Sequence, residues 1–265
     1  MAFGVMHIIN VAHGDIMILA AFMIYWIFFS IPNASIYNLF LIALLVPAVL
    51  ALIGYIFQRY IVNRLIEGPP LSTLLLFFGL MLVLPNAIIV LWGPYTRSII
   101  LPELSYAVSI GLIKISLNKI LTLVLSTALI AVVMLLLQKS RIGIAIRATA
   151  QNREGAVICG VNIKHIYSLV LAIAFFLEGF AGFLIAINYA FTPVQGVIYT
   201  LFGFLVVVLG GMGYLPGAVL AGILIGLLQA FISSYLGTTF AYAIIFLILY
   251  LTLLLRPRGL LGRGI

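Results

Sequence analysis

The chain has 265 residues, of which 66% are hydrophobic and only 7% are charged. Soluble domains carry about 25% charged residues, so this composition excludes a soluble protein and indicates an integral membrane protein. The single cysteine, Cys159, excludes an intrachain disulfide, and no grouping of Cys and His indicates a metal site. The formal net charge of +8 is expected on cytoplasmic loops rather than on a nucleic-acid surface, because those loops are enriched in Lys and Arg.

Eight apolar runs are long enough to be membrane-spanning helices. Roughly 20 apolar residues cross the ~30 Å hydrocarbon core, and helices are expected because backbone in lipid must satisfy its hydrogen bonds internally. The predicted fold class is an all-α integral membrane protein, a polytopic bundle of about eight transmembrane helices forming a single domain over 1–265. The predicted spans are 15–30, 36–58, 71–92, 117–138, 166–190, 197–212, 215–235 and 239–255.

The motif GVMHIINVAHGD places several polar residues beside the first span. One interpretation is a polar lining near a transport path. The other is structural: the Asp15 carboxylate caps the helix that begins there, while Asn10 and His13 bond local backbone. The two histidines of the motif are six residues apart and do not face each other on a helix, so no metal site is expected. The path candidates are Asn10, His13, Gly14 and Asp15.

The positive charges predict the orientation of the chain. With segment 139–165 inside, 59–70 and the C-terminus are also inside, and ten basic residues face the cytoplasm against three outside. The segment 93–116 is then extracytoplasmic. Its alternating residues around Gly111 predict a short external β-hairpin.

The segment Lys139 to His165 carries five of the thirteen basic residues and its own helix signals. Ile142 to Ala150 is predicted to be a short helix, with Arg147 at its centre. Asn152 is a predicted cap of a second short helix, and Glu154 falls in the first turn of that helix, where the helix dipole favours a carboxylate.

The end of this segment also has helix signals. Gly160 fits the left-handed position that ends a helix, and Asn162 can cap the next span. An apolar face of Ala156, Val157 and Ile158 would form a knob that fits the groove of a partner. The alternative is a basic loop that lies on lipid headgroups.

Glu178 lies in the middle of the span 166–190, in the sequence AFFLEGFAGF. A charged carboxylate at the bilayer centre costs about 2.5–3.5 kcal/mol on insertion scales, so such a residue is a functional candidate. The structural alternative is a protonated carboxyl that hydrogen-bonds to a neighbouring helix, with Asn188 or Gln229 as its partner.

Small residues recur at a spacing of four, which allows helix backbones to approach closely. Gly182 and Ala186 form one such pair. The run between 197 and 235 is broken by GGMG and PG, which predicts either a tight turn or unwound backbone at membrane depth. The predicted packing glycines are Gly210, Gly211, Gly213, Gly217, Gly222 and Gly226.

Three segments resemble the permease subunits of ABC importers for branched-chain amino acids, the hydrophobic amino-acid uptake family, and in particular its H-type member. They are GVMHIINVAHGDIMILAAF at Gly4 to Phe22, RIGIAIRATAQNREGAVICGVN at Arg141 to Asn162, and GFLVVVLGGMGYLPGAVLAGILIG at Gly203 to Gly226, followed by RPRGLLGR. Two features depart from the family pattern. The sequence begins inside the first motif, so we expect either that the true start lies upstream or that the helix which precedes this motif in the family is missing. Glu178 stands where the family has small apolar residues.

The resemblance implies a type II-like ABC importer permease, a multi-pass protein of the plasma (inner) membrane of a prokaryote. Its implied partners are the lipid bilayer, a second permease subunit, an extracytoplasmic solute-binding protein and two ATP-binding cassette subunits. ATP and Mg would bind to those cassette subunits, because this chain has no GxxxxGK[ST]. The chain itself is expected to bind no cofactor and to have no catalytic residue.

The implied mechanism is inward transport of branched-chain or other hydrophobic amino acids by alternating access. Smooth small-residue faces would let the two permease subunits rock against each other. Segment 139–165 is then the coupling loop that the ATPase contacts. Its predicted coupling residues are Arg147, Glu154, Ala156, Gly160 and Val161.

Three alternatives stay open. The chain could be a same-family permease for urea, short amides or sugars. It could also be a stand-alone secondary transporter, which would need a charged relay in the membrane that only Glu178 and Asp15 could supply. An intramembrane enzyme would need a nucleophile and base, and no GxSxG, HExxH or paired-Asp motif is present.

Overall fold

The computed structural model describes residues 2–6, 8–66, 68–110 and 113–255. Its contacts divide the chain into two compact units, Gly4–Val197 and the residues from Ile198 onward. The expectation of a single domain over 1–265 stays a prediction.

The first unit consists of long helices joined by short helices and one hairpin. Its elements are α1 (Ala2–Met6), α2 (His13–Ser30), α3 (Ile36–Phe57), the π-helix η1 (Gln58–Val62), α4 (Asn63–Leu65), α5 (Pro70–Trp92), α6 (Pro102–Ser105), β1 (Ala107–Ile110), β2 (Ile113–Ser116), α7 (Leu117–Lys139), α8 (Arg141–Gln151), α9 (Arg153–Ile158), α10 (Ile163–Asn188) and the 3-10 helix η2 (Pro193–Gln195). The helix α11 (Gly196–Gly210) begins at the end of this unit. The second unit continues with α12 (Leu215–Leu236) and α13 (Thr238–Leu255).

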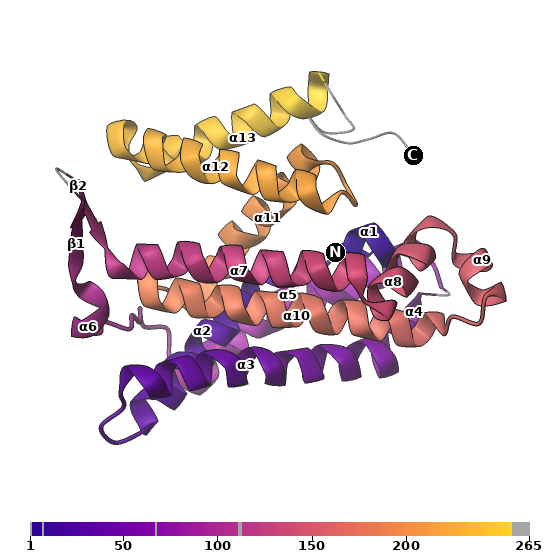
Figure 1. Ribbon diagram of the computed structural model, residues 1–265, viewed down its shortest axis with the longest axis horizontal. Coiled ribbons are helices and arrows are strands. Elements are labelled where there is room, and N and C mark those ends of the chain that lie inside the picture. Colours follow the sequence, from indigo (N-terminus) through magenta and orange to yellow (C-terminus); the bar gives the residue numbers. More distant parts are fainter. Residues whose placement is uncertain (1, 7, 67, 111–112, 256–265) are drawn as a thin grey trace. The chain divides into compact units, whose positions relative to one another are not determined.

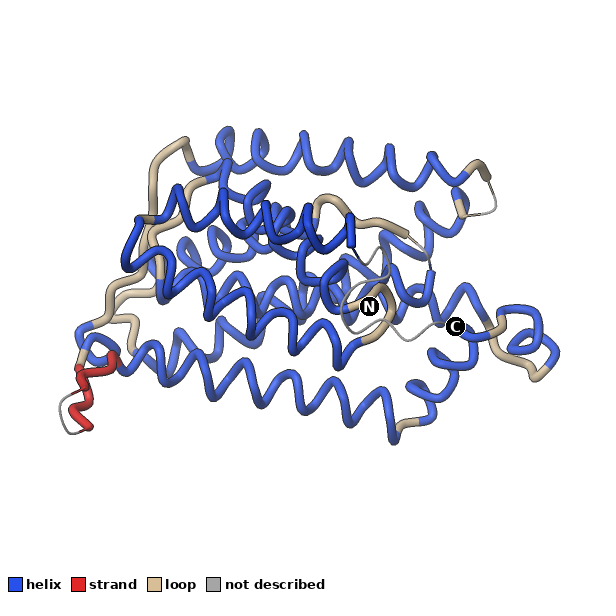
Figure 2. Tube along the Cα trace, turned by 90° about the horizontal axis from the view of Figure 1, so that it is seen from above, coloured by secondary structure: helices blue, strands red, loops and turns tan. Residues whose placement is uncertain are grey.

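The predicted fold class is confirmed. Among the described residues, seven helices are long and apolar enough to cross a membrane, and Thr238–Thr252 forms a shorter apolar helix. The helix ends fall within a few residues of the predicted spans. In the first unit, the β-hairpin lies at one end of the long helices and α8 and α9 lie at the opposite end (Figures 1 and 2).

The helix α10 packs between α2 and α3 at glycine residues, which have no side chain to keep the backbones apart. A Cβ atom placed on Gly182 would lie 2.7 Å from the Cβ of Ala20 in α2, and one on Gly179 would lie 2.9 Å from the Cα of Pro47 in α3. Phe175 of α10 occupies the space that a side chain on Gly54 would need. Small residues therefore let three backbones approach closely. Of the predicted pair Gly182 and Ala186, Gly182 lies at such a contact, whereas Gly179 and Gly54 were not predicted.

An aromatic cluster joins α2 to α5 and to the segment after α10. The ring of Phe22 stacks on Trp92 at 6.1 Å and meets the ring of Phe191 edge-on at 5.1 Å. The Arg97 guanidinium lies over the ring of Tyr25 at 5.4 Å, and Arg97 also pairs its backbone with that of Phe191. Each aromatic pair contributes about 0.5–1.5 kcal/mol beyond its buried area, so this cluster fixes the segment that follows α5.

The predicted hairpin is confirmed. Strands β1 and β2 pair antiparallel, from Ala107 opposite Ser116 to Ile110 opposite Ile113. Gly111, on which the prediction centred, lies outside the described residues.

In the second unit, a tight turn joins α11 to α12, so the alternative of unwound backbone is excluded there. Gly211 and Gly213 have φ of +90° and +86°, and the backbone N–H of Tyr214 donates to the carbonyl of Gly211 at 3.1 Å. A Cβ on Gly210 would lie 2.5 Å from the carbonyl carbon of Gly217. Of the predicted packing glycines, Gly211 and Gly213 thus form the turn, and Gly210 and Gly217 form the close contact between α11 and α12.

The other two predicted packing glycines have no tight contact within this unit. The nearest atom to a Cβ on Gly222 would be Val206 Cγ1 at 4.0 Å, and a Cβ on Gly226 would meet nothing within 4 Å. The reason is that the buried side of α12 is built by larger residues instead. The buried core of the unit consists of Leu205, Leu209, Ala221, Ile225 and Ile245.

Replacing Gly182 by Ala should destabilise the protein, since the new methyl group would force α10 away from α2. Overpacking of this kind costs on the order of 1–3 kcal/mol. The unfolding temperature in detergent should therefore fall for Gly182→Ala. The matched control is Gly79→Ala in α5, where a Cβ would meet nothing within 4 Å. An equal fall in both variants would contradict close packing at Gly182.

Candidate functional site

The polar motif before α2 is held by Asn10 rather than by Asp15. The Oδ1 of Asn10 accepts a hydrogen bond from the backbone N–H of Ala12 at 3.0 Å, and the Nδ1 of His13 lies 2.8 Å from the carbonyl oxygen of Asn10. The predicted local bonding of Asn10 and His13 is thus confirmed. Gly14 follows as a buried residue of the first turn.

The prediction that Asp15 caps this helix is wrong. The helix α2 begins at His13, with Ala12 at the cap position and no capping side chain, so Asp15 already lies inside the first turn. Its side chain is fully buried, and neither carboxylate oxygen has a hydrogen-bond partner in the described part of the chain. Buried polar groups are rarely left unpaired, and each such group calls for an explanation.

Gly196 makes room for this buried carboxylate. A Cβ on Gly196 would lie 2.6 Å from the Cγ of Asp15. The preceding turn η2 is fixed by a capping box, in which the Gln195 side chain accepts from the backbone N–H of Thr192 at 2.9 Å. Sequence analysis missed Gly196, because no local signal connects it with a residue 181 positions earlier.

Glu178 bonds to the same motif. The Nδ2 of Asn10 donates to the Oε1 of Glu178 at 3.2 Å, while Oε2 is buried without a partner in the described part of the chain. A hydrogen bond of Glu178 was predicted, but its partner was predicted wrongly: it is neither Asn188 nor Gln229 on a helix but Asn10, in the non-helical residues 8–12. Asn188 lies ten positions further along the same helix, about 15 Å away along its axis, and donates to Thr122 and Leu184 instead. Gln229 belongs to the second unit.

This bond places the polar motif at membrane depth. Glu178 follows Ile163, the first residue of α10, by 15 positions, which is about 22 Å along the helix. Residues 8–12, between α1 and α2, are not helical. The helical backbone is thus interrupted beside the middle of a membrane-spanning helix, and irregular backbone at that depth requires cover by protein or a water-filled cavity.

At the opposite end from the hairpin, the coupling loop forms the two predicted short helices, α8 and α9 (Figure 1). The Oδ1 of Asn152 accepts from the backbone N–H of Gly155 at 2.8 Å, and the Oδ1 of Asn162 accepts from that of His165 at 3.1 Å. Both predicted caps are confirmed. Sequence analysis missed a third: the Oγ of Ser140 accepts from the backbone N–H of Gly143 at 2.9 Å and so begins α8 directly after α7.

The end of α9 is a Schellman motif. Gly160 has φ of +82°, which confirms its predicted left-handed position. The N–H of Gly160 donates to the carbonyl of Val157, and the N–H of Val161 to that of Ala156, which is the bonding pattern of this motif. Gly160 and Val161, both predicted coupling residues, therefore set the direction in which the chain leaves α9.

The remaining predicted coupling residues occupy different environments. Arg147 is exposed and donates a hydrogen bond to the carbonyl of Leu137 in α7, so it joins α8 to α7. Glu154 is exposed in the first turn of α9. Ala156 was expected on the apolar knob, but only 4% of it is exposed, because it faces the inner side of this six-residue helix. The exposed apolar residues are Val157, at 54%, and Ile158, at 86%.

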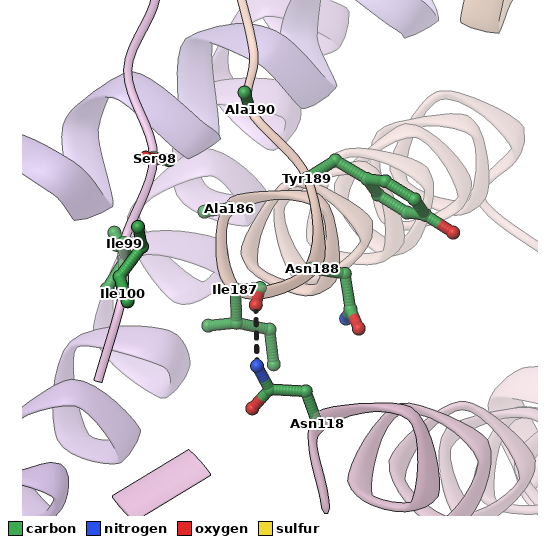
Figure 3. A pocket seen from close by; sticks show the side chains of 9 residues that line it. All are labelled: Ser98, Ile99, Ile100, Asn118, Ala186, Ile187, Asn188, Tyr189 and Ala190. Atoms are coloured by element: carbon green, nitrogen blue, oxygen red, sulfur yellow. Dashed lines mark hydrogen bonds between the residues drawn. The ribbon is translucent and has the colours of Figure 1, made fainter. Parts of the chain in front are cut away.

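The C-terminal end of α10 holds a pocket of about 300 Å³ (Figure 3). Asn118 of α7 donates to the carbonyl of Ile187 at 3.1 Å, and the N–H of Ile99 donates to that of Ala186 at 3.3 Å. The final carbonyl groups of α10 are thus bonded by α7 and by the segment after α5. Sequence analysis missed this site because no local pattern connects Asn118 and the residues after α5 with the end of α10. The pocket is lined by Ser98, Ile99, Ile100, Asn118, Ala186, Ile187, Asn188, Tyr189 and Ala190.

Comparison with known proteins identifies the family. Residues 1–253 match the family described as branched-chain amino acid transport system / permease component. The chain is 29% identical to the high-affinity branched-chain amino acid transport system permease protein BraD of Pseudomonas aeruginosa, over 99% of this chain and 89% of BraD. It is 26% identical to the corresponding LivH proteins of Escherichia coli K12 and Salmonella typhimurium, over 99% of this chain and 88% of each relative.

No solved structure gives a significant match. The family match covers nearly the whole chain, including the interrupted helix before α2 and the capped coupling loop. The chain therefore belongs to the family of branched-chain amino acid transport system permease components.

Proposed function

We propose that the chain is the membrane-spanning permease subunit of an ATP-driven importer that moves branched-chain amino acids into a prokaryotic cell across its inner membrane. The family membership and the relatives' names support this substrate class. The observation that carries the proposal is the coupling loop, because three side-chain caps and a Schellman motif give it a fixed shape that a simple linker does not need.

The proposed complex has four kinds of component. A second permease subunit forms the path together with this chain, two ATP-binding cassette subunits bind ATP and Mg, and an extracytoplasmic solute-binding protein delivers the amino acid. The charge distribution supports the orientation, since the coupling loop holds five basic residues and basic loops face the cytoplasm. The hairpin of β1 and β2, at the other end of the long helices, then faces outward.

In this proposal the ATPase docks on the exposed side of α9. Val157 and Ile158 present apolar surface, and Arg153 and Glu154 beside them are exposed and charged. Apolar residues surrounded by charged ones are typical of the centre and rim of a protein interface. Arg147, Gly160 and Val161 act by holding this surface in place, while Ala156 supports it from inside.

The proposed translocation path runs beside the interrupted helix at Asn10, His13, Gly14 and Asp15. Discontinuous helices near the bilayer midplane form substrate sites in other transporters, because helix ends and free backbone groups can hold a charged solute. The buried Asp15 carboxylate, which has no partner in the described part of the chain, and Glu178 with its bond to Asn10 supply polar groups at this depth. Polar groups within membranes commonly mark such pathways.

The docking proposal is tested by replacing Ile158 with Asp. Purification of the tagged chain from its host in mild detergent should recover an ATP-hydrolysing partner with the wild type and at least about thirtyfold less with Ile158→Asp, since an interface hot spot contributes about 2 kcal/mol or more. The matched control is Ile100→Asp at the other end of the unit, which is 77% exposed and should leave recovery unchanged. Full recovery with Ile158→Asp would exclude docking on α9, and absence of any such partner from the wild type would exclude the importer.

The path proposal is tested by Asp15→Asn. Because the carboxylate makes no hydrogen bond in the described part of the chain, the unfolding temperature should change by less than the 2–4 °C that about 1 kcal/mol produces in a protein of this size. Uptake of leucine into proteoliposomes that contain the assembled transporter should fall. Asn10→Leu, which removes two hydrogen bonds, should by contrast lower the unfolding temperature. Normal uptake by Asp15→Asn would contradict a role of Asp15 in the path.

A further inference from the structure

Two amide side chains are buried where α3 meets η1 and α4. Gln58 is fully buried and Asn63 is 6% exposed. Burying an amide without a hydrogen bond costs on the order of 1–3 kcal/mol judged from protein mutations, so such residues persist where their bonds have a purpose. The Nε2 of Gln58 donates to the Oδ1 of Asn63 at 3.1 Å, and the Nδ2 of Asn63 donates to the carbonyl oxygen of Lys164 at 3.2 Å.

These bonds reach the point where the coupling loop becomes α10. Lys164 is the second residue of α10 and follows the cap residue Asn162 by two positions. A second contact lies one residue further on, where the Tyr55 hydroxyl is 3.0 Å from the Nδ1 of His165. We call the chain of hydrogen bonds from Gln58 through Asn63 to the carbonyl of Lys164 the amide latch.

The latch is built on an unusual backbone. Residues Gln58–Val62 form a π-helix, a rare conformation that is found mostly as single turns at functional sites. It widens the helix directly before Asn63, at the end of a continuous apolar helical run over Ile36–Leu65. The π-turn thus places Asn63 against the start of α10 while α3 itself packs along the middle of α10 at Gly54 and Gly179.

We propose that Gln58 and Asn63 are positioning residues for energy coupling, which hold α3 to the end of the coupling loop so that a movement of α8 and α9 shifts α3 and α10 together. This inference rests on the proposed function. The Schellman motif at Gly160 fixes the direction in which the loop leaves α9, but its hydrogen bonds join only residues of the loop itself. The latch fastens the second residue of α10 to the helical run that includes α3. A movement of α8 and α9 is therefore transmitted to both α3 and α10.

The link requires a side chain at position 63 that both accepts and donates. Asn63 accepts from Gln58 and donates to the carbonyl of Lys164 at the same time, which its neutral amide can do. An apolar side chain would fill the space but break the link. Asn63 makes the direct bond to Lys164, and Gln58 orients the Asn63 amide. Loss of the Asn63 side chain should therefore reduce coupling at least as much as loss of the Gln58 side chain, and the double variant should match Asn63→Leu.

The test uses the assembled transporter in proteoliposomes and measures leucine taken up per ATP hydrolysed. Gln58→Met and Asn63→Leu should retain the ATPase subunits and hydrolyse ATP at close to the wild-type rate, while the coupling ratio falls about tenfold. The double variant should fall no further. The matched control is Asn118→Leu, which removes the same kind of bond, from an asparagine amide to a carbonyl of α10, at the other end of that helix, and should leave the ratio unchanged.

The outcomes separate this inference from the proposed function. An unchanged ratio in Asn63→Leu would overturn the latch, as would an equal loss in Asn118→Leu, because the effect would then be general destabilisation. Loss of the ATPase subunits from Asn63→Leu would also overturn it, since the residue would then serve docking rather than transmission. If the wild type itself hydrolyses ATP but moves no leucine, or captures no ATPase, the proposed function fails and the latch fails with it.

Discussion

The close approach of α10 to α2 and α3 is the contact on which the rest of the first unit depends. Gly182 and Gly179 bring two neighbouring backbones to distances at which even a methyl group would collide. In lipid, the hydrophobic effect does not drive helices together, so this close van der Waals contact must supply the association. It also positions the polar groups of α10, since Glu178 lies one helical turn before Gly182 and therefore on the face that meets α2.

Polar side chains bond α10 to its neighbours at three levels. Asn63 reaches its beginning, Asn10 its middle and Asn118 its end. Each uses an amide, which remains neutral in an apolar environment and can donate and accept. The bonds at the two ends contact backbone carbonyls, whereas the bond at the middle contacts a carboxyl group beside an interruption of the helical backbone. The bonds of Asn63 and Asn118 at the two ends of α10 therefore fit a role in holding the helices together. The bond of Asn10 at the centre fits the proposed translocation path.

The coupling loop combines a rigid fold with an exposed surface. Its caps satisfy the N–H groups at the helix starts, and the Schellman motif satisfies the last carbonyls of α9. The loop is also joined to α7, because Arg147 donates to the carbonyl of Leu137. Further hydrogen bonds, at Ser140 and at Lys164, lie where the loop meets α7 and α10.

The sequence by itself determined what depends on neighbouring residues: the spans, the hairpin, the caps at Asn152 and Asn162, and the left-handed Gly160. The spans follow from apolar length and the hairpin from alternating residues. The caps follow from a side chain that bonds backbone three residues away, and Gly160 from the lack of a Cβ atom at a left-handed helix end. The tertiary structure alone decided which distant residues meet. The bonding of Glu178 to Asn10, the space that Gly196 leaves for Asp15 and the link from Asn63 to Lys164 each join positions about a hundred residues apart or more. No local pattern encodes such pairs, because they arise from the angle and register at which whole helices pack.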